Sequence, residues 1–178
     1  MSENLRGPVI YHQWSIEQTL ARLKELPQAV ITEPIQSVFP TVLHALLHIL
    51  SADELWVGRV KNSVWASEKA SGERHTKPTT DEPLDGLDIG DMGQRFEAIF
   101  RDLVSFTTVI EPTCEVEYHN SKGEVFQTLL QDIITHLVNH GTYHLGNITA
   151  MLRQQGYTGV SVDYITFVRS GRGSDFRG

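Results

Sequence analysis

The chain has 178 residues, which suits one domain with an ordinary hydrophobic core. Apolar residues make up 40% and charged residues 21%, a composition that excludes a disordered chain. Fifteen basic and 22 acidic side chains give a net charge of −7, which argues against a nucleic-acid binder that neutralises phosphates. The single cysteine, Cys114, excludes an internal disulfide and any zinc site with two or more cysteines.

The first residues contain no basic region followed by an apolar stretch, so we expect no signal peptide. The longest uncharged run, residues 34–52, contains two prolines and two histidines and is a poor membrane span. We therefore expect a cytoplasmic protein without a membrane partner.

The first half of the chain predicts two long helices. Apolar spacing predicts a helix over residues 8–26, with Pro8 in its first turn. A second helix is predicted over residues 37–61, with Ser37 as its cap and Pro40 in its first turn. Apolar positions cover most of the circumference of the second helix, which indicates that it is largely buried.

A polar stretch, residues 63–90, is rich in glycine, proline and threonine and reads as a long crossover loop. A third helix is predicted over residues 91–109. Apolar and polar residues then alternate over residues 114–126, on both sides of an Asn-Ser-Lys-Gly turn at 120–123. This pattern predicts a small β-hairpin.

The fourth helix is predicted over residues 127–155, and Asp163 is the expected cap of a short helix over residues 164–168. Four long helices favour an all-α four-helix bundle with a long crossover between helices 2 and 3 and a hairpin before helix 4. We expect one domain over residues 1–170 and a flexible tail over residues 171–178.

Five of the eight histidines lie in two short segments, and three of them are in the fourth helix. At 100° per residue, His136 and His144 lie about 40° to either side of His140, on the face that also carries the core residues. Imidazoles four residues apart on a helix can reach one metal ion. Gly141 stands where the helical zinc-protease motif has glutamate, so this is not a protease helix.

The second helix offers a third nitrogen. His48 lies on a stripe of small or polar residues in an otherwise apolar helix, and such a stripe leaves room between helices: Thr41, His44, Ala45, Ser51 and Ala52. Three histidines leave coordination positions open, which is typical of a catalytic site, and imidazole ligands favour zinc, nickel or iron over magnesium or calcium. The alternative is that these histidines are packed or hydrogen-bonded core residues.

Four segments in the correct order resemble the DinB / YfiT-like family. Residues 136–148 (HLVNHGTYHLGNI) look like its signature helix, and residues 47–56 (LHILSADELW) look like its second-helix signature. The Tyr-His-Gln-Trp motif at residues 11–14 and the Val-Asp-Tyr-Ile motif at residues 162–165 resemble its first-helix and C-terminal elements. The resemblance covers almost the whole chain.

The resemblance implies a four-helix bundle that holds a divalent metal through three histidines, which map to His48, His140 and His144. It also implies a homodimer. Many members have no known activity; characterised relatives include transferases and isomerases that use a low-molecular-weight thiol such as bacillithiol or mycothiol, and others are described as metal-dependent hydrolases. The family name records induction by damage and not binding to DNA.

Two positions depart from the family pattern. The family helix commonly continues His-Arg-Gly-Gln, whereas this chain has His-Leu-Gly-Asn and its amide, Asn147, is one methylene shorter. The first-helix motif usually has asparagine where this chain has Ile16. We expect His44, His136 and Asn147 to lie behind the metal ligands, with a packed core position as the alternative for His44 and His136.

Two classes of function follow. In the first, the protein is an enzyme whose metal activates a small thiol, as an S-transferase, or water, as a hydrolase, toward a small-molecule substrate. No carboxylate is placed by the sequence as a general base, which favours thiol transfer. In the alternative, it is a non-catalytic metal-binding or stress-response interaction protein, and a fourth protein ligand that closes the site would favour this reading.

Trp14, Trp56 and Tyr143 are expected in the core.

Overall fold

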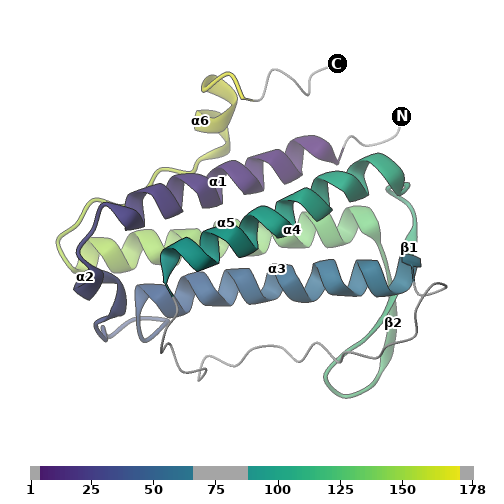
Figure 1. The fold of residues 1–178 in the computed structure, drawn as a ribbon, viewed down its shortest axis with the longest axis horizontal. Helices are drawn as coiled ribbons and strands as arrows, with labels where there is room; N and C mark the ends of the chain where they lie inside the picture. Colours follow the sequence, from purple (N-terminus) through teal and green to yellow (C-terminus); the bar gives the residue numbers. More distant parts are fainter. Residues whose placement is uncertain (1–4, 66–87, 173–178) are drawn as a thin grey trace.

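The computed structural model describes residues 5–65 and 88–172, and these residues are mostly helical with one small sheet (Figure 1). The elements in chain order are α1 (Arg6–Lys24), α2 (Gln28–Thr32), α3 (Val42–Trp65), α4 (Ile89–Val109), β1 (Glu115–His119), β2 (Val125–Leu129), α5 (Leu130–Gln154) and α6 (Tyr164–Arg169).

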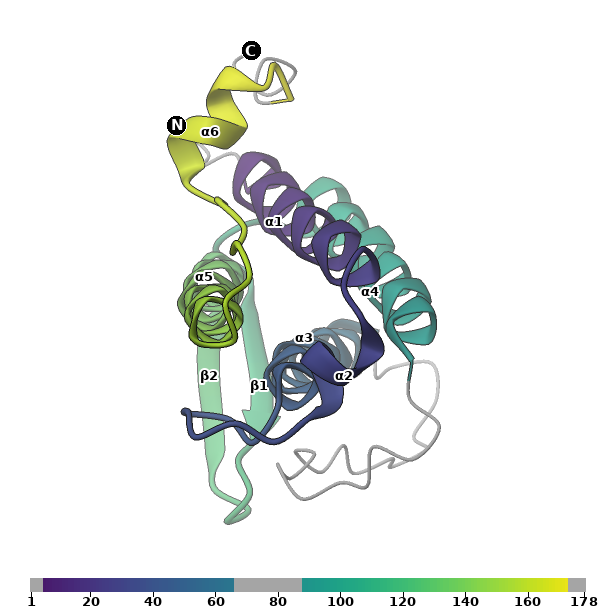
Figure 2. The same cartoon turned by 90° about the vertical axis from the view of Figure 1, so that its left-hand side faces the viewer.

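The four long helices pack along one another. Helix α1 contacts α4 and α5, and α3 contacts the same two helices from the other side. Figure 2, which looks along the helices, shows these four around a common interior. Apolar side chains from all four fill this interior, among them Ile16, Leu23, Leu46, Ile49, Met92, Phe96, Leu137 and Ile148.

The start of α3 differs from the prediction. The helix begins at Val42 and not at residue 37, so Ser37 is not its cap and Pro40 lies before it. Thr41 takes the capping role, because its Oγ1 accepts a hydrogen bond of 3.1 Å from the backbone N–H of His44. The preceding turn contains α2, whose five residues are too few to show a helical period in the sequence.

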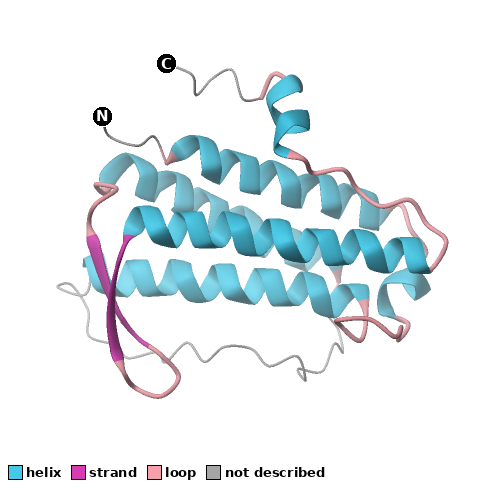
Figure 3. Cartoon of the chain, turned by 180° about the vertical axis from the view of Figure 1, so that it is seen from behind, coloured by secondary structure: helices cyan, strands magenta, loops and turns pink. Residues whose placement is uncertain are grey.

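The predicted hairpin is present. Strands β1 and β2 pair antiparallel, and Gly123, with φ of +81°, lies in the turn between them. Residues 127–129, predicted as the first turn of the fourth helix, belong instead to β2, because their backbones pair with β1. Helix α5 therefore begins at Leu130 (Figure 3).

The hairpin is attached to α3 by an arginine held between two aromatic rings. The guanidinium of Arg59 lies 4.5 Å from the ring centroids of both Trp56 and Tyr118. Its Nη2 also donates a hydrogen bond of 3.2 Å to the carbonyl of His119. Burial lowers the pKa of Arg59 from its usual value, and the charge of Tyr118 partly offsets this.

Helix α6 packs against α1. Phe167 is buried against Tyr11 and Trp14, and the Tyr11 hydroxyl donates a hydrogen bond of 2.8 Å to the carbonyl of Val162. Asp163 occupies the predicted position before the helix, but its side chain makes no capping hydrogen bond. It accepts one from the Ser161 hydroxyl instead.

Two predicted segments fall largely outside the described residues. Of the expected crossover, residues 63–65 extend α3 and residues 89–90 begin α4, whereas residues 66–87 are outside. Of the expected tail, Arg172 is described and pairs with Glu17 at 2.9 Å, and residues 173–178 are outside. No helix within residues 5–65 and 88–172 has both the length and the apolar character needed to cross a bilayer.

Candidate metal centre

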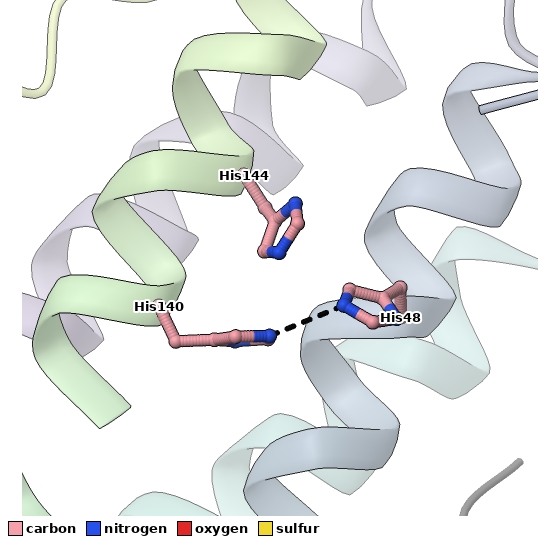
Figure 4. Close-up of side chains that lie close together, drawn as sticks. All are labelled: His48, His140 and His144. Atoms are coloured by element: carbon pink, nitrogen blue, oxygen red, sulfur yellow. Dashed lines mark hydrogen bonds between the residues drawn. The ribbon is translucent and has the colours of Figure 1, made fainter. Parts of the chain in front are cut away.

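Three histidines from two helices converge in the interior. Nε2 of His48 on α3 and Nε2 of His140 on α5 are 3.1 Å apart, within hydrogen-bond distance (Figure 4). His144 lies one turn beyond His140, and its ring centroid is 4.5 Å from each of the other two rings. One nitrogen from each histidine lies within 4.8 Å of the others.

The helices explain this convergence. His140 and His144 are four residues apart and so project from the same face of α5, one above the other. Helices α3 and α5 run in opposite directions and are in contact, which brings His48 to the level of this face (Figure 1). All three imidazoles are partly buried.

The spacing of the nitrogens fits a metal ion. Two imidazole nitrogens bound to one zinc ion in tetrahedral geometry, each about 2.0–2.1 Å from it, are about 3.3 Å apart. The 3.1 Å between His48 and His140 is close to this value. Among the described residues no fourth histidine, cysteine or carboxylate joins the cluster, so three ligands would leave positions open.

The surroundings of His140 keep its imidazole in the form that can ligate a metal. The pKa of His140 is lowered to about 3, first by burial and then by the charges of His144 and His48. His140 is therefore neutral at neutral pH, and a neutral imidazole is the form that binds a metal.

Comparison with known proteins agrees with this geometry. The family model of the DinB family matches residues 1–173. The chain belongs to the DinB family. It is also similar to Protein DinB of Bacillus subtilis (strain 168), with 33% identity over 155 residues, covering 86% of this chain and 87% of that protein. The family resemblance in the sequence is thereby confirmed.

Asn147 contacts His144 in this DinB-family protein, and its role behind a metal ligand stays a prediction. Its Nδ2 is 3.3 Å from Nδ1 of His144. If His144 used Nε2 as a ligand, its Nδ1 would carry a proton. The side-chain amide of Asn147, with its oxygen and nitrogen positions exchanged, would then accept that proton in a hydrogen bond. The shorter amide thus still reaches the ring.

His136 lies beside the three converging histidines, and His44 lies one turn before His48 on α3. Nδ1 of His44 is 2.8 Å from Oγ1 of Thr41, at the first turn of α3. His136 is exposed and not in the core, and its ring packs against Trp56 and His140, with centroids 5.4 and 5.7 Å apart. The predicted supporting roles of both residues stay predictions.

Two aromatic residues border the histidines. Tyr143, predicted in the core, is 66% exposed, and its ring centroid is 4.9 Å from that of His144. Phe39 is buried, with its ring 5.3 Å from His48 and 5.4 Å from His144. Sequence reasoning missed Phe39 because it precedes α3 in an irregular segment that has no period.

A buried polar pair, His12 and Asp53, was also missed in the sequence analysis. Nε2 of His12 on α1 is 2.8 Å from Oδ2 of Asp53 on α3, and the two side chains are only 2% and 0% exposed. The ring of His12 lies against Gly141, the neighbour of His140: a Cβ atom at position 141 would be 2.7 Å from His12 Nδ1. The available signal was the helical spacing of His12, Ser15 and Thr19, three polar residues on the buried face of α1.

Proposed function

We propose that this DinB-family protein binds one divalent metal ion through His48, His140 and His144 and uses it to activate a small thiol for transfer to an electrophilic small molecule. Zinc and nickel are the first candidates and iron is the next, because imidazole suits all three. The convergence of three imidazoles, two of them with Nε2 atoms 3.1 Å apart, carries this proposal. We take the four long helices to be the four-helix bundle of the family.

A divalent ion at this site would supply Lewis acidity and lower the pKa of a thiol or water molecule. The chain contributes the positioning. The three imidazoles bring no charge, and Phe39 and Tyr143 place aromatic surface beside them. Within the described residues no carboxylate belongs to the ligand cluster, which supports thiol transfer over hydrolysis, since water needs a base more than a thiol does.

The test uses protein loaded with cobalt or nickel. Small thiols are titrated in, and a new sulfur-to-metal charge-transfer absorption is expected. Consumption of the thiol with a model electrophile is then compared between the wild type and His48→Ala, which should lose activity. His119→Ala, at an exposed histidine on β1, is the control and should keep both the spectrum and the rate.

The outcomes separate the candidate functions. If no thiol perturbs the spectrum and His48→Ala matches the wild type in rate, thiol transfer is wrong. Bound metal with hydrolysis of model esters or amides would support the hydrolase. Bound metal with neither reaction would support the non-catalytic metal-binding or stress-response role.

The cellular setting is also a proposal. We propose a homodimer in the cytoplasm that acts on a small molecule, on the strength of the family resemblance. Sedimentation of the purified protein over a range of concentrations tests the dimer, and a monomer at all concentrations would contradict it.

A further inference from the structure

The His12–Asp53 pair lies beside the metal centre. The two side chains come from different helices, and their 2.8 Å contact uses only Oδ2 of the carboxylate. The other oxygen, Oδ1 of Asp53, is enclosed and has no hydrogen-bond partner in the described part of the chain. A buried carboxylate oxygen without a hydrogen-bond donor costs free energy of folding, so we look for a function that explains it.

His140 carries the complementary group. Its Nδ1 is likewise enclosed without a partner, and within residues 5–65 and 88–172 the only other such side-chain atom is the hydroxyl oxygen of Ser51. Nε2 of His140 faces His48 and is the nitrogen available for a metal. An imidazole that binds through Nε2 carries its proton on Nδ1 and normally donates it to a carboxylate, a carbonyl or water.

The packing puts the donor and the acceptor in the same region. Because α3 and α5 run in opposite directions, the residues that follow His48 lie level with those that precede His140 (Figure 1). The ring of His12 lies between these two helices, since it contacts Asp53 on α3 and lies against Gly141 on α5.

We propose that Asp53, held in place by His12, is the positioning residue of His140: its Oδ1 accepts the Nδ1–H of His140, directly or through one enclosed water, when a divalent cation binds. The proposal rests on the metal binding proposed above. It gives the enclosed oxygen of Asp53 a role, because an acceptor at Nδ1 would hold the proton of His140 there and leave Nε2 for the metal.

The experiment compares zinc affinity, by competition with a chromophoric chelator, between the wild type and Asp53→Asn. Loss of a carboxylate behind a ligating histidine should weaken zinc binding about 10–100-fold. Glu54→Gln is the matched control: it is the next residue of α3, its ion pair with Arg95 is partly exposed, and its zinc affinity should not change. The second readout is the His140 Nδ1–H signal in ¹⁵N-edited spectra of the zinc-loaded protein, which should exchange slowly in the wild type and faster in Asp53→Asn.

The possible results separate this inference from the proposed metal binding. Equal zinc affinity and equal exchange in the wild type and Asp53→Asn overturn this inference and leave the metal site standing, even if the variant melts at a lower temperature. A wild type that binds no zinc, nickel or iron overturns both proposals. If Asp53→Asn does not fold, the same two measurements on His12→Gln replace it, since glutamine keeps a donor for Asp53 but loses the ring that lies against Gly141.

Discussion

The imidazole of His12 lies so close to the backbone of Gly141 that no side chain fits between them. A Cβ atom at position 141 would be 2.7 Å from Nδ1 of His12 and nearer still to Cε1. The ring is buried and bound to Asp53, so it cannot move aside without breaking that contact. The contact thus ties α1 to α5 beside His140.

Gly141→Ala should destabilise the protein by about 1–3 kcal/mol, because the added methyl overpacks a filled interior. Gly146→Ala, on the same helix with no atom within 4 Å of its Cβ position, should instead stabilise by about 0.5–1 kcal/mol. Denaturant unfolding of the metal-free proteins measures both. Equal effects of the two substitutions would show that the His12 contact is not tight.

Metal content should depend on each of the three converging histidines. His140→Ala and His144→Ala should each sharply reduce the bound metal from one ion per chain, because two imidazoles hold an ion less well than three. His119→Ala should retain it, since His119 is exposed on β1. Elemental analysis of the purified variants is the measurement, and undiminished metal in the first two would contradict the assignment.

The metal-free protein should lose stability in acid. The folded-state pKa of His140 is about 3, whereas an unfolded histidine titrates near 6.5. Between these values the unfolded chain binds a proton that folded His140 does not. The contribution of His140 to the free energy of unfolding is therefore largest above about pH 6.5 and decreases as the pH falls toward about 3. Urea titrations at several pH values should show this slope.

The control for this slope is His140→Ala. Removing the imidazole removes its share of the proton uptake, so the dependence on pH should become flatter over the same range. An identical slope in the variant would mean that another group is responsible.

The hairpin should loosen when Arg59 is replaced. Arg59→Met keeps an apolar stem but removes the charge between Trp56 and Tyr118, and each such contact is worth about 0.5–1 kcal/mol. Amide exchange in β1 should become faster, as read by hydrogen-exchange mass spectrometry. The same change at Arg101, exposed on α4, should leave β1 exchange unchanged.

The three converging histidines were easier to predict from the sequence than the residues around them. His140 and His144 are four residues apart on one helix, so their common direction follows from helical geometry alone. His48 could be added because its polar stripe interrupts an apolar helix and the family resemblance includes it. The structure brings all three together.

The residues that surround the centre depend on contacts between distant segments. His12 and Asp53 are 41 positions apart, and their pairing follows only from how α1 and α3 pack. The start of α3 was misplaced because Ser37 and Thr41 are both good caps, and only the hydrogen bond to His44 distinguishes them. The first turn predicted for the fourth helix became strand because β1 supplies partners for those backbones.

The segment before α3 links the stability of the scaffold to the surroundings of the histidines. Phe39 covers one side of His48 and His144, yet it belongs to no helix, and its turn is closed by the backbone bond from Ile35 to Pro40. Its neighbour Thr41 anchors the helix. Phe39 also belongs to the main hydrophobic core, so a smaller residue at position 39 would expose one side of both imidazoles and weaken the fold in the same step.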